Sequence, residues 1–137
     1  MKVAIPVSGD RVSNAFDFAR RLLVVEFEAD REVARVEVAL REDRPIGRAR
    51  RLAALGVRLV ICGAVSRRLA EHLERAGVAV MPFVSGQVLE VLDGYRRGDL
   101  DSPRFLMPGS TVDDRRAWRR GLDRPAAGPT QDAPSNS

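Results

Sequence analysis

The sequence predicts an α/β protein with a ribonuclease H-like, five-stranded mixed sheet in the order 3-2-1-4-5 and three flanking helices. Two observations lead to this fold class. Residues 1–40 contain three β-prone segments in succession, which predicts an antiparallel meander. Residues 45–98 alternate helical spacing with short apolar segments, and helical crossovers of this kind join parallel strands with right-handed connections.

The first strand is expected at residues 3–7, which are apolar and are followed by a tight loop of Ser8, Gly9 and Asp10. Residues 22–27 predict the second strand. Apolar and charged side chains alternate over residues 32–40, which predicts a half-exposed third strand. The first strand is therefore expected at the centre of the sheet, with the meander on one side of it.

Helical spacing over residues 46–56 predicts the first helix, with Arg48, Arg50 and Arg51 pointing outward. Residues 57–62 form an apolar segment typical of a buried strand.

A second helix is expected to start at the N-cap Ser66 and to end at Gly77. Residues 78–82 predict the last strand. Ser85 is expected to cap the final helix, which Gly98 closes.

The core signal fades beyond residue 100. We therefore expect one domain over residues 1–100 and a C-terminal extension, partly packed or helical, over residues 101–121. Residues 122–137 are rich in Pro, Ala, Gly, Ser and Asp, and their few apolar side chains cannot offset the entropy of ordering, so a disordered tail is expected.

Composition narrows the functional class. The 137 residues include one cysteine, which excludes an internal disulfide, and no run approaches the ~18 apolar residues of a membrane span. The apolar stretch at the N-terminus is too short for a signal peptide, so a cytoplasmic protein without a membrane partner is expected. The net charge of +4 comes almost entirely from arginine interspersed with 19 acidic residues. We interpret this as the codon bias of a GC-rich genome and expect no nucleic-acid partner.

A ligand site is expected where the strand order changes direction, because open α/β sheets bind ligands beyond the carboxyl ends of their parallel strands. Small residues there let backbone N–H groups approach a ligand, and helix N-termini favour anions. The candidate binding residues are Ser8, Gly9, Asp10, Cys62, Gly63, Ala64, Ser85 and Gly86. The alternative is that these glycines only turn the chain.

Cys62 is the candidate metal ligand, because a thiolate at the mouth of a groove can hold iron. A helix N-terminus beside it would lower its pKa. The alternative is a small core residue at the end of a buried strand. A structural zinc site is not expected, because one cysteine and one histidine, His72, cannot fill tetrahedral coordination.

Several segments, in order along the chain, resemble the dinitrogenase iron–molybdenum cofactor biosynthesis domain family. They are Ile5-Pro6-Val7-Ser8-Gly9-Asp10 with Val12-Ser13, Val60-Ile61-Cys62-Gly63-Ala64, Ala76-Gly77-Val78 and Ser85-Gly86. The resemblance covers about residues 1–100. It implies a ribonuclease H-like fold and a role, related to nitrogen fixation, in binding or carrying iron–sulfur or iron–molybdenum cofactor precursors. It also implies partners among cofactor assembly proteins.

The sequence departs from the family pattern at three positions. Many members carry Ser-x-His-Phe-Gly after the first loop, where this chain has Ala15 in place of the histidine and Asp17 in place of the glycine. Residues Met107-Pro108-Gly109 resemble a tail found in some members. In those members a cysteine often follows, where this chain has Ser110.

Three functions follow from these features. The first is a non-catalytic carrier of a cofactor precursor, and the alternative is a ligand-free interaction or regulatory module descended from the family. A metal-dependent nuclease is disfavoured, because two-metal chemistry needs clustered carboxylates and residues 2–7 and 57–62 contain none. The sequence does not predict the cluster type, the donor and acceptor proteins or the oligomeric state.

Overall fold

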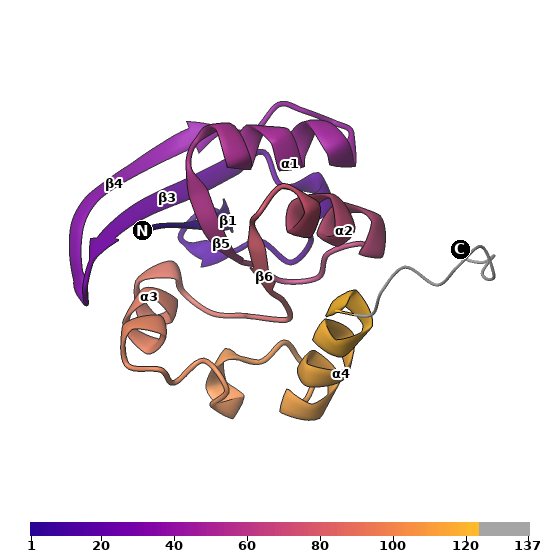
Figure 1. Cartoon of the computed structure of the whole chain (residues 1–137). Coiled ribbons are helices and arrows are strands. Elements are labelled where there is room, and N and C mark those ends of the chain that lie inside the picture. The colour runs from indigo at the N-terminus through magenta and orange to yellow at the C-terminus, as the bar shows by residue number, and fades with distance from the viewer. Residues whose placement is uncertain (124–137) are drawn as a thin grey trace, which may run out of the picture.

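The computed structural model describes residues 1–123 of the chain. Within them, six strands form one mixed sheet (Figure 1). Their bounds are β1 (Lys2–Ser8), β2 (Arg11–Val12), β3 (Arg21–Glu28), β4 (Arg31–Ala39), β5 (Val57–Ile61) and β6 (Ala79–Met81). The order is β4-β3-β1-β5-β6, and β2 pairs only with β1.

The strand directions make this a mixed sheet. β1 is antiparallel to β2 and β3 and parallel to β5, which is in turn parallel to β6. The α/β class is confirmed, and β1 is central as expected. The ribonuclease H-like assignment stays a prediction.

The predicted count of five strands is wrong, because the sheet has six within the described residues. The predicted order 3-2-1-4-5 is therefore wrong too, since the extra strand changes the number of every strand after the first. The difference arises from β2, in which Val12 pairs with Val7 and Arg11 with Ser8 across a tight turn. Two residues are too few for a period of two to mark a strand in the sequence.

Four α-helices surround the sheet within the described residues, with two short 3-10 turns. The bounds are α1 (Pro45–Ala54), α2 (Arg67–Arg75), α3 (Val88–Arg96) and α4 (Val112–Asp123), with η1 (Phe16–Phe18) and η2 (Pro103–Phe105). The three flanking helices of the prediction correspond to α1, α2 and α3, and α4 lies in the predicted extension.

The alternation of side chains along β1 divides the core into two parts. Ala4 packs into a cluster with residues of α1 and α2, whereas Val3, Ile5 and Val7 pack with residues of α3 on the other side of the sheet. Successive side chains of a strand point to opposite faces, so one strand serves both layers. The sheet is thereby fixed between α1 and α2 on one face and α3 on the other.

Two of the expected helix features differ from the structure. Arg48 was expected to point outward, but only 1% of its surface is exposed. Ser85 does not cap α3, because the N-cap is Gln87 and its side chain makes no capping hydrogen bond. The expected cap at Ser66 is confirmed, since its side chain accepts a hydrogen bond from the Leu69 N–H.

The predicted division into residues 1–100, 101–121 and 122–137 stays a prediction. α4 continues to Asp123 and so includes the first two residues of the predicted tail. Residues 124–137, on which the disorder prediction falls, lie outside the described residues. Among residues 1–123, no helix is long and apolar enough to cross a membrane.

Candidate functional site

The loop after β1 and the loop before α3 are held together by backbone hydrogen bonds. Gly9, with φ of 61°, allows the tight turn between β1 and β2. The Val12 N–H donates to the Gly86 carbonyl at 3.0 Å, and the Val88 N–H donates to the Asp10 carbonyl at 2.9 Å. The two loops therefore lie side by side at the carboxyl end of β1.

The segment that follows β2 runs beside the loop after β5. The Ala64 N–H donates to the Asn14 carbonyl, and the Phe16 N–H donates to the Ala64 carbonyl, both at 2.9 Å. A Cβ atom on Gly63 would lie 2.6 Å from the Ser13 carbonyl oxygen. Glycine is required at this position because the two backbones approach so closely.

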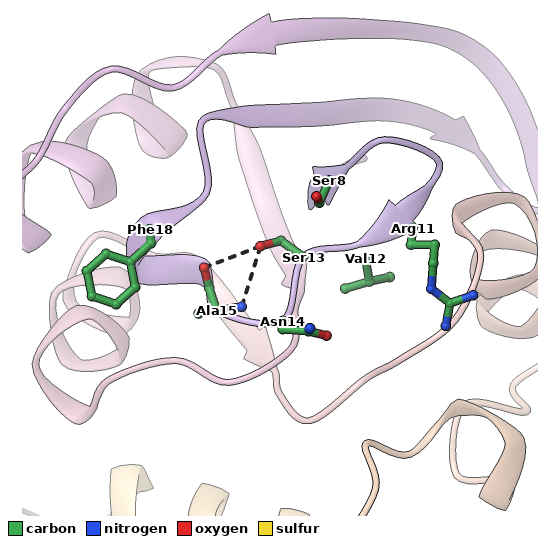
Figure 2. Close-up of a pocket in the computed structure, with 7 residues that line it drawn as sticks. All are labelled: Ser8, Arg11, Val12, Ser13, Asn14, Ala15 and Phe18. Carbon is green, nitrogen blue, oxygen red and sulfur yellow. Dashed lines mark hydrogen bonds between the residues drawn. The ribbon is translucent and has the colours of Figure 1, made fainter.

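Residues of the 8–18 segment line an open pocket of about 360 Å³ (Figure 2). Seven residues line it: Ser8, Arg11, Val12, Ser13, Asn14, Ala15 and Phe18. Arg11 and Phe18 lie at opposite ends of this set in Figure 2. Phe18 is 79% exposed. We call this set the β1–η1 pocket.

Arg11 supplies the charge of the β1–η1 pocket. None of the other six lining residues is ionisable, and Ser8, Ser13 and Asn14 add hydroxyl and amide groups. Within residues 1–123, Arg11 is in no ion pair. A guanidinium with nearby polar groups suits an anionic ligand.

The predicted binding residues fall into three groups. Ser8 lines the pocket, and Gly9 and Asp10 form the turn beside it. Three of the other small residues contact the pocket segment through their backbones, with Gly63 and Ala64 on one side and Gly86 on the other, whereas the Ser85 N–H donates to the Phe105 carbonyl. Cys62 is buried beneath them.

Six of the lining residues were not predicted: Arg11, Val12, Ser13, Asn14, Ala15 and Phe18. They belong to β2, η1 and the loop between them, which are too short to leave a periodic pattern in the sequence. Two sequence signals mark it, a basic residue directly after the first loop and an aromatic residue outside any predicted element. Ala15 is also a position at which the chain departs from the family pattern.

Cys62 lies in the hydrophobic core. None of its surface is exposed, and it packs in the cluster that contains Leu69 and Val80. Burial raises the pKa of the Cys62 thiol, and the nearby Asp17 carboxylate raises it further. The expected lowering of this pKa is therefore wrong, because loss of hydration outweighs the field of the helix N-terminus.

The residues present do not fit a metal cluster held by protein ligands. Among residues 1–123, no three His, Cys, Asp or Glu side chains lie close enough together to hold a metal ion. The thiol of Cys62 is enclosed and favours its protonated form, whereas iron binds the thiolate. Cys62 in this buried, protonated state does not suit iron ligation.

The N-terminus of α2 is occupied by a side chain of this protein. The Asp17 carboxylate accepts hydrogen bonds from the Ser66 N–H at 2.7 Å and from the Ser66 hydroxyl at 2.6 Å. Ser66 Oγ in turn accepts from the Leu69 N–H at 3.1 Å. Asp17 thus supplies the negative charge that a helix N-terminus favours, and leaves less room there for an outside anion.

Arg48 fixes the segment that carries Asp17 and Phe18. Its guanidinium donates from Nη1 to the Phe16 carbonyl at 3.1 Å and to the Ala19 carbonyl at 2.7 Å. Burial lowers the pKa of Arg48, but arginine keeps its proton because its ordinary pKa is so high. These hydrogen bonds attach the 3-10 turn η1 to α1.

Comparison with known proteins identifies the family. Residues 1–98 match the family model described as "Dinitrogenase iron-molybdenum cofactor". The chain therefore belongs to this family, which is associated with biosynthesis of that cofactor. A search of curated proteins found no match.

Solved structures share the fold. PH0822 is 24% identical with a TM-score of 0.68, over 72% of this chain and 92% of that chain. A putative dinitrogenase from Methanocaldococcus jannaschii is 18% identical with a TM-score of 0.60, over 72% and 90%. A protein from Thermotoga, described as a putative NifB protein of the DUF35 family, is 27% identical with a TM-score of 0.58, over 72% and 89%.

Proposed function

We propose that this chain is a non-catalytic binding protein for an iron–sulfur or iron–molybdenum cofactor precursor, and that the β1–η1 pocket holds the precursor. The observation that carries the proposal is the position of Arg11, an arginine without an ion partner in residues 1–123, in a pocket at the carboxyl end of the central strand. Ligands of open α/β sheets bind at this end.

The precursor is cargo and brings its own sulfides. An anionic cluster of this kind needs compensating positive charge and hydrogen-bond donors, and a guanidinium supplies both. Arg11 would pair with the cluster, while the Asn14 amide and the Ser8 hydroxyl would donate to its sulfides. The Ser13 hydroxyl already donates to the Ala15 carbonyl at 3.3 Å (Figure 2). Cys62 takes no part, since it is buried in the core.

The proposal extends to the surroundings of the protein. A carrier receives its cargo from one protein and delivers it to another, so its partners would be iron–sulfur or cofactor assembly proteins. Such exchange suits a reducing cytoplasm. The open shape of the pocket suits it too, because cargo that is not enclosed can be transferred directly.

The test is anaerobic calorimetric titration with tetrathiomolybdate, an anionic molybdenum–sulfur probe. The wild type should bind it, and Arg11→Gln should weaken binding at least about tenfold, because a charge-assisted contact is lost. Arg58→Gln is the matched control, because Arg58 is exposed on β5 and lies outside the pocket lining. Cys62→Ala should bind like the wild type. Equal loss of binding in the two arginine variants would contradict the proposed site.

A ligand-free interaction or regulatory module is the second candidate. Asp17 favours it, since its carboxylate already occupies the N-terminus of α2, and so does Ala15, which cannot ligate a metal. If the wild type binds neither tetrathiomolybdate nor a preassembled iron–sulfur cluster, this second function replaces the first.

A further inference from the structure

The two outer edges of the sheet differ in how they are covered. At β6, α4 covers the edge: Arg119 donates to the Val80 carbonyl, and Arg115 Nε donates to the Pro82 carbonyl at 2.8 Å. At the other edge, β4 is the end of the strand order and pairs with β3 alone within residues 1–123. Figure 1 shows β4 at the outer rim of the sheet, away from α4.

β4 is long and exposed for an edge strand. Arg31–Ala39 spans nine residues, and eight of them are exposed. It contains no proline or lysine, which commonly protect such edges from pairing. Val36 is 54% exposed on the face that carries Val24 and Ala34.

The register of the hairpin defines which backbone groups point outward. The Leu40 N–H donates to the Arg20 carbonyl at 2.8 Å, and residues 21–26 pair with residues 39–34 in continuous register. Hydrogen-bonded and non-hydrogen-bonded pairs alternate in an antiparallel ladder. The even-numbered residues therefore face β3, and the backbone groups of Arg35, Glu37 and Ala39 point away from the sheet.

We propose that β4 pairs with β4 of a second copy of this chain, antiparallel and centred on Val36. Charge favours this register over the two adjacent ones. Pairing centred on Arg35 places two arginines opposite each other, and pairing centred on Glu37 opposes two glutamates. Centring on Val36 places each Arg35 opposite the Glu37 of the other copy, and opposite charges across a strand pair are stabilising whereas like charges are destabilising.

The same register agrees with the backbone and with the apolar face. Arg35 and Glu37 both point their backbone groups outward, so they can exchange hydrogen bonds across the new ladder. Val36 meets Val36 of the second copy in a non-hydrogen-bonded pair, the type in which side chains lie closest. Ala34 lies opposite Val38 of the second copy. The product is one sheet that continues through both copies and leaves both β1–η1 pockets at a distance from the interface.

The experiment measures the mass of the full chain by light scattering after size exclusion, over a series of concentrations. The wild type should have twice the mass of one chain and dissociate on dilution. Arg35→Glu places glutamate opposite glutamate at two places in the dimer, and Glu37→Arg places arginine opposite arginine at two places. Each substitution should therefore weaken self-association at least about tenfold. The pairs that these residues make within the chain, with Glu32 and Arg21, are exposed, so both variants should fold.

Mixing the two single variants provides the decisive comparison. The site of Arg35→Glu in one copy then faces the site of Glu37→Arg in the other, and the unchanged Glu37 of the first copy faces the unchanged Arg35 of the second. Opposite charges meet at both places, so the mixture should form a dimer that neither variant forms alone. The double variant R35E/E37R should dimerise like the wild type. A monomeric wild type at every soluble concentration would overturn the proposal, and so would a dimer that both single variants retain, because its interface would lie elsewhere.

Discussion

Arg48 links α1 to the turn that follows the β1–η1 pocket, through hydrogen bonds to the Phe16 and Ala19 carbonyls. Arg48→Met keeps an unbranched side chain in place of the aliphatic part of arginine but leaves both buried carbonyls without this donor. We expect a loss of about 2–4 kcal/mol in the free energy of unfolding, measured with urea. Arg50→Met, on the exposed side of α1, is the control and should change it by less than about 0.5 kcal/mol. Equal effects in the two variants would contradict the structural role of Arg48.

Cys62 predicts a specific dependence of stability on pH. Its thiol titrates near pH 8.5 in the unfolded chain, and burial raises the pKa in the folded protein. Below about pH 8.5 both states keep the proton, so the thiol contributes no pH dependence. Above it the unfolded chain loses the proton first, so stability should fall by up to about 1.4 kcal/mol per pH unit.

The comparison of the wild type with Cys62→Ala isolates this effect. The variant should lose about 1 kcal/mol of stability at neutral pH, from lost packing. Its free energy of unfolding should also fall less steeply above about pH 8.5, because the thiol no longer contributes. Urea unfolding under reducing conditions measures both effects. Parallel pH profiles for the two proteins would show that the thiol is accessible to water in the folded state.

At the scale of elements, the pocket depends on how closely two loops approach. Gly63→Ala would place a methyl group 2.6 Å from the Ser13 carbonyl oxygen and 2.9 Å from that of Asn14. Both obstacles are backbone atoms, so the segment must shift, at a cost of about 2 kcal/mol. Thermal unfolding should report this loss.

Gly121→Ala is the matched control for that substitution. Gly121 lies within α4, and the nearest atoms to a new Cβ belong to the flexible guanidinium of Arg67. Alanine favours helix, so the control should be neutral or slightly stabilising. A stable Gly63→Ala variant would mean that the two loops are not held in contact.

The regular elements could be predicted because their patterns are local. β3, β4 and β5 follow the β-prone and apolar segments closely, and Ser66 caps α2 as its position before the helix indicates. Arg48 could not be predicted in this way. Helical spacing does not distinguish it from Arg50, because its partners, Phe16 and Ala19, lie far away along the chain.

Of the seven residues that line the β1–η1 pocket, only Ser8 was among the candidate binding residues. The glycines mark where loops meet, since the Gly86 carbonyl accepts from the Val12 N–H and Gly63 lies against the Ser13 carbonyl. The lining comes mainly from β2, η1 and the loop between them. Contacts between residues that are distant along the chain fix the directions of these side chains. Cys62 is buried in a cluster that includes Phe16, a residue distant from it along the chain.

At the scale of the whole molecule, the two surfaces proposed for binding are separate. The β1–η1 pocket lies at the carboxyl end of β1, and the proposed pairing edge is β4, with β3 between the two strands. A dimer would therefore carry two independent pockets. Loss of self-association in Arg35→Glu should leave binding of the anionic probe unchanged, which allows each proposal to fail without the other.

The proposed function requires that an anionic cofactor precursor binds at the β1–η1 pocket without ligation by Cys62. Amide chemical-shift mapping by NMR, during anaerobic titration with tetrathiomolybdate, tests it most directly because it locates the ligand residue by residue. We predict that the largest shifts fall within residues 8–18, that they are lost in Arg11→Gln, and that they persist in Cys62→Ala. Shifts centred elsewhere, or shifts that disappear only in Cys62→Ala, would contradict the claim.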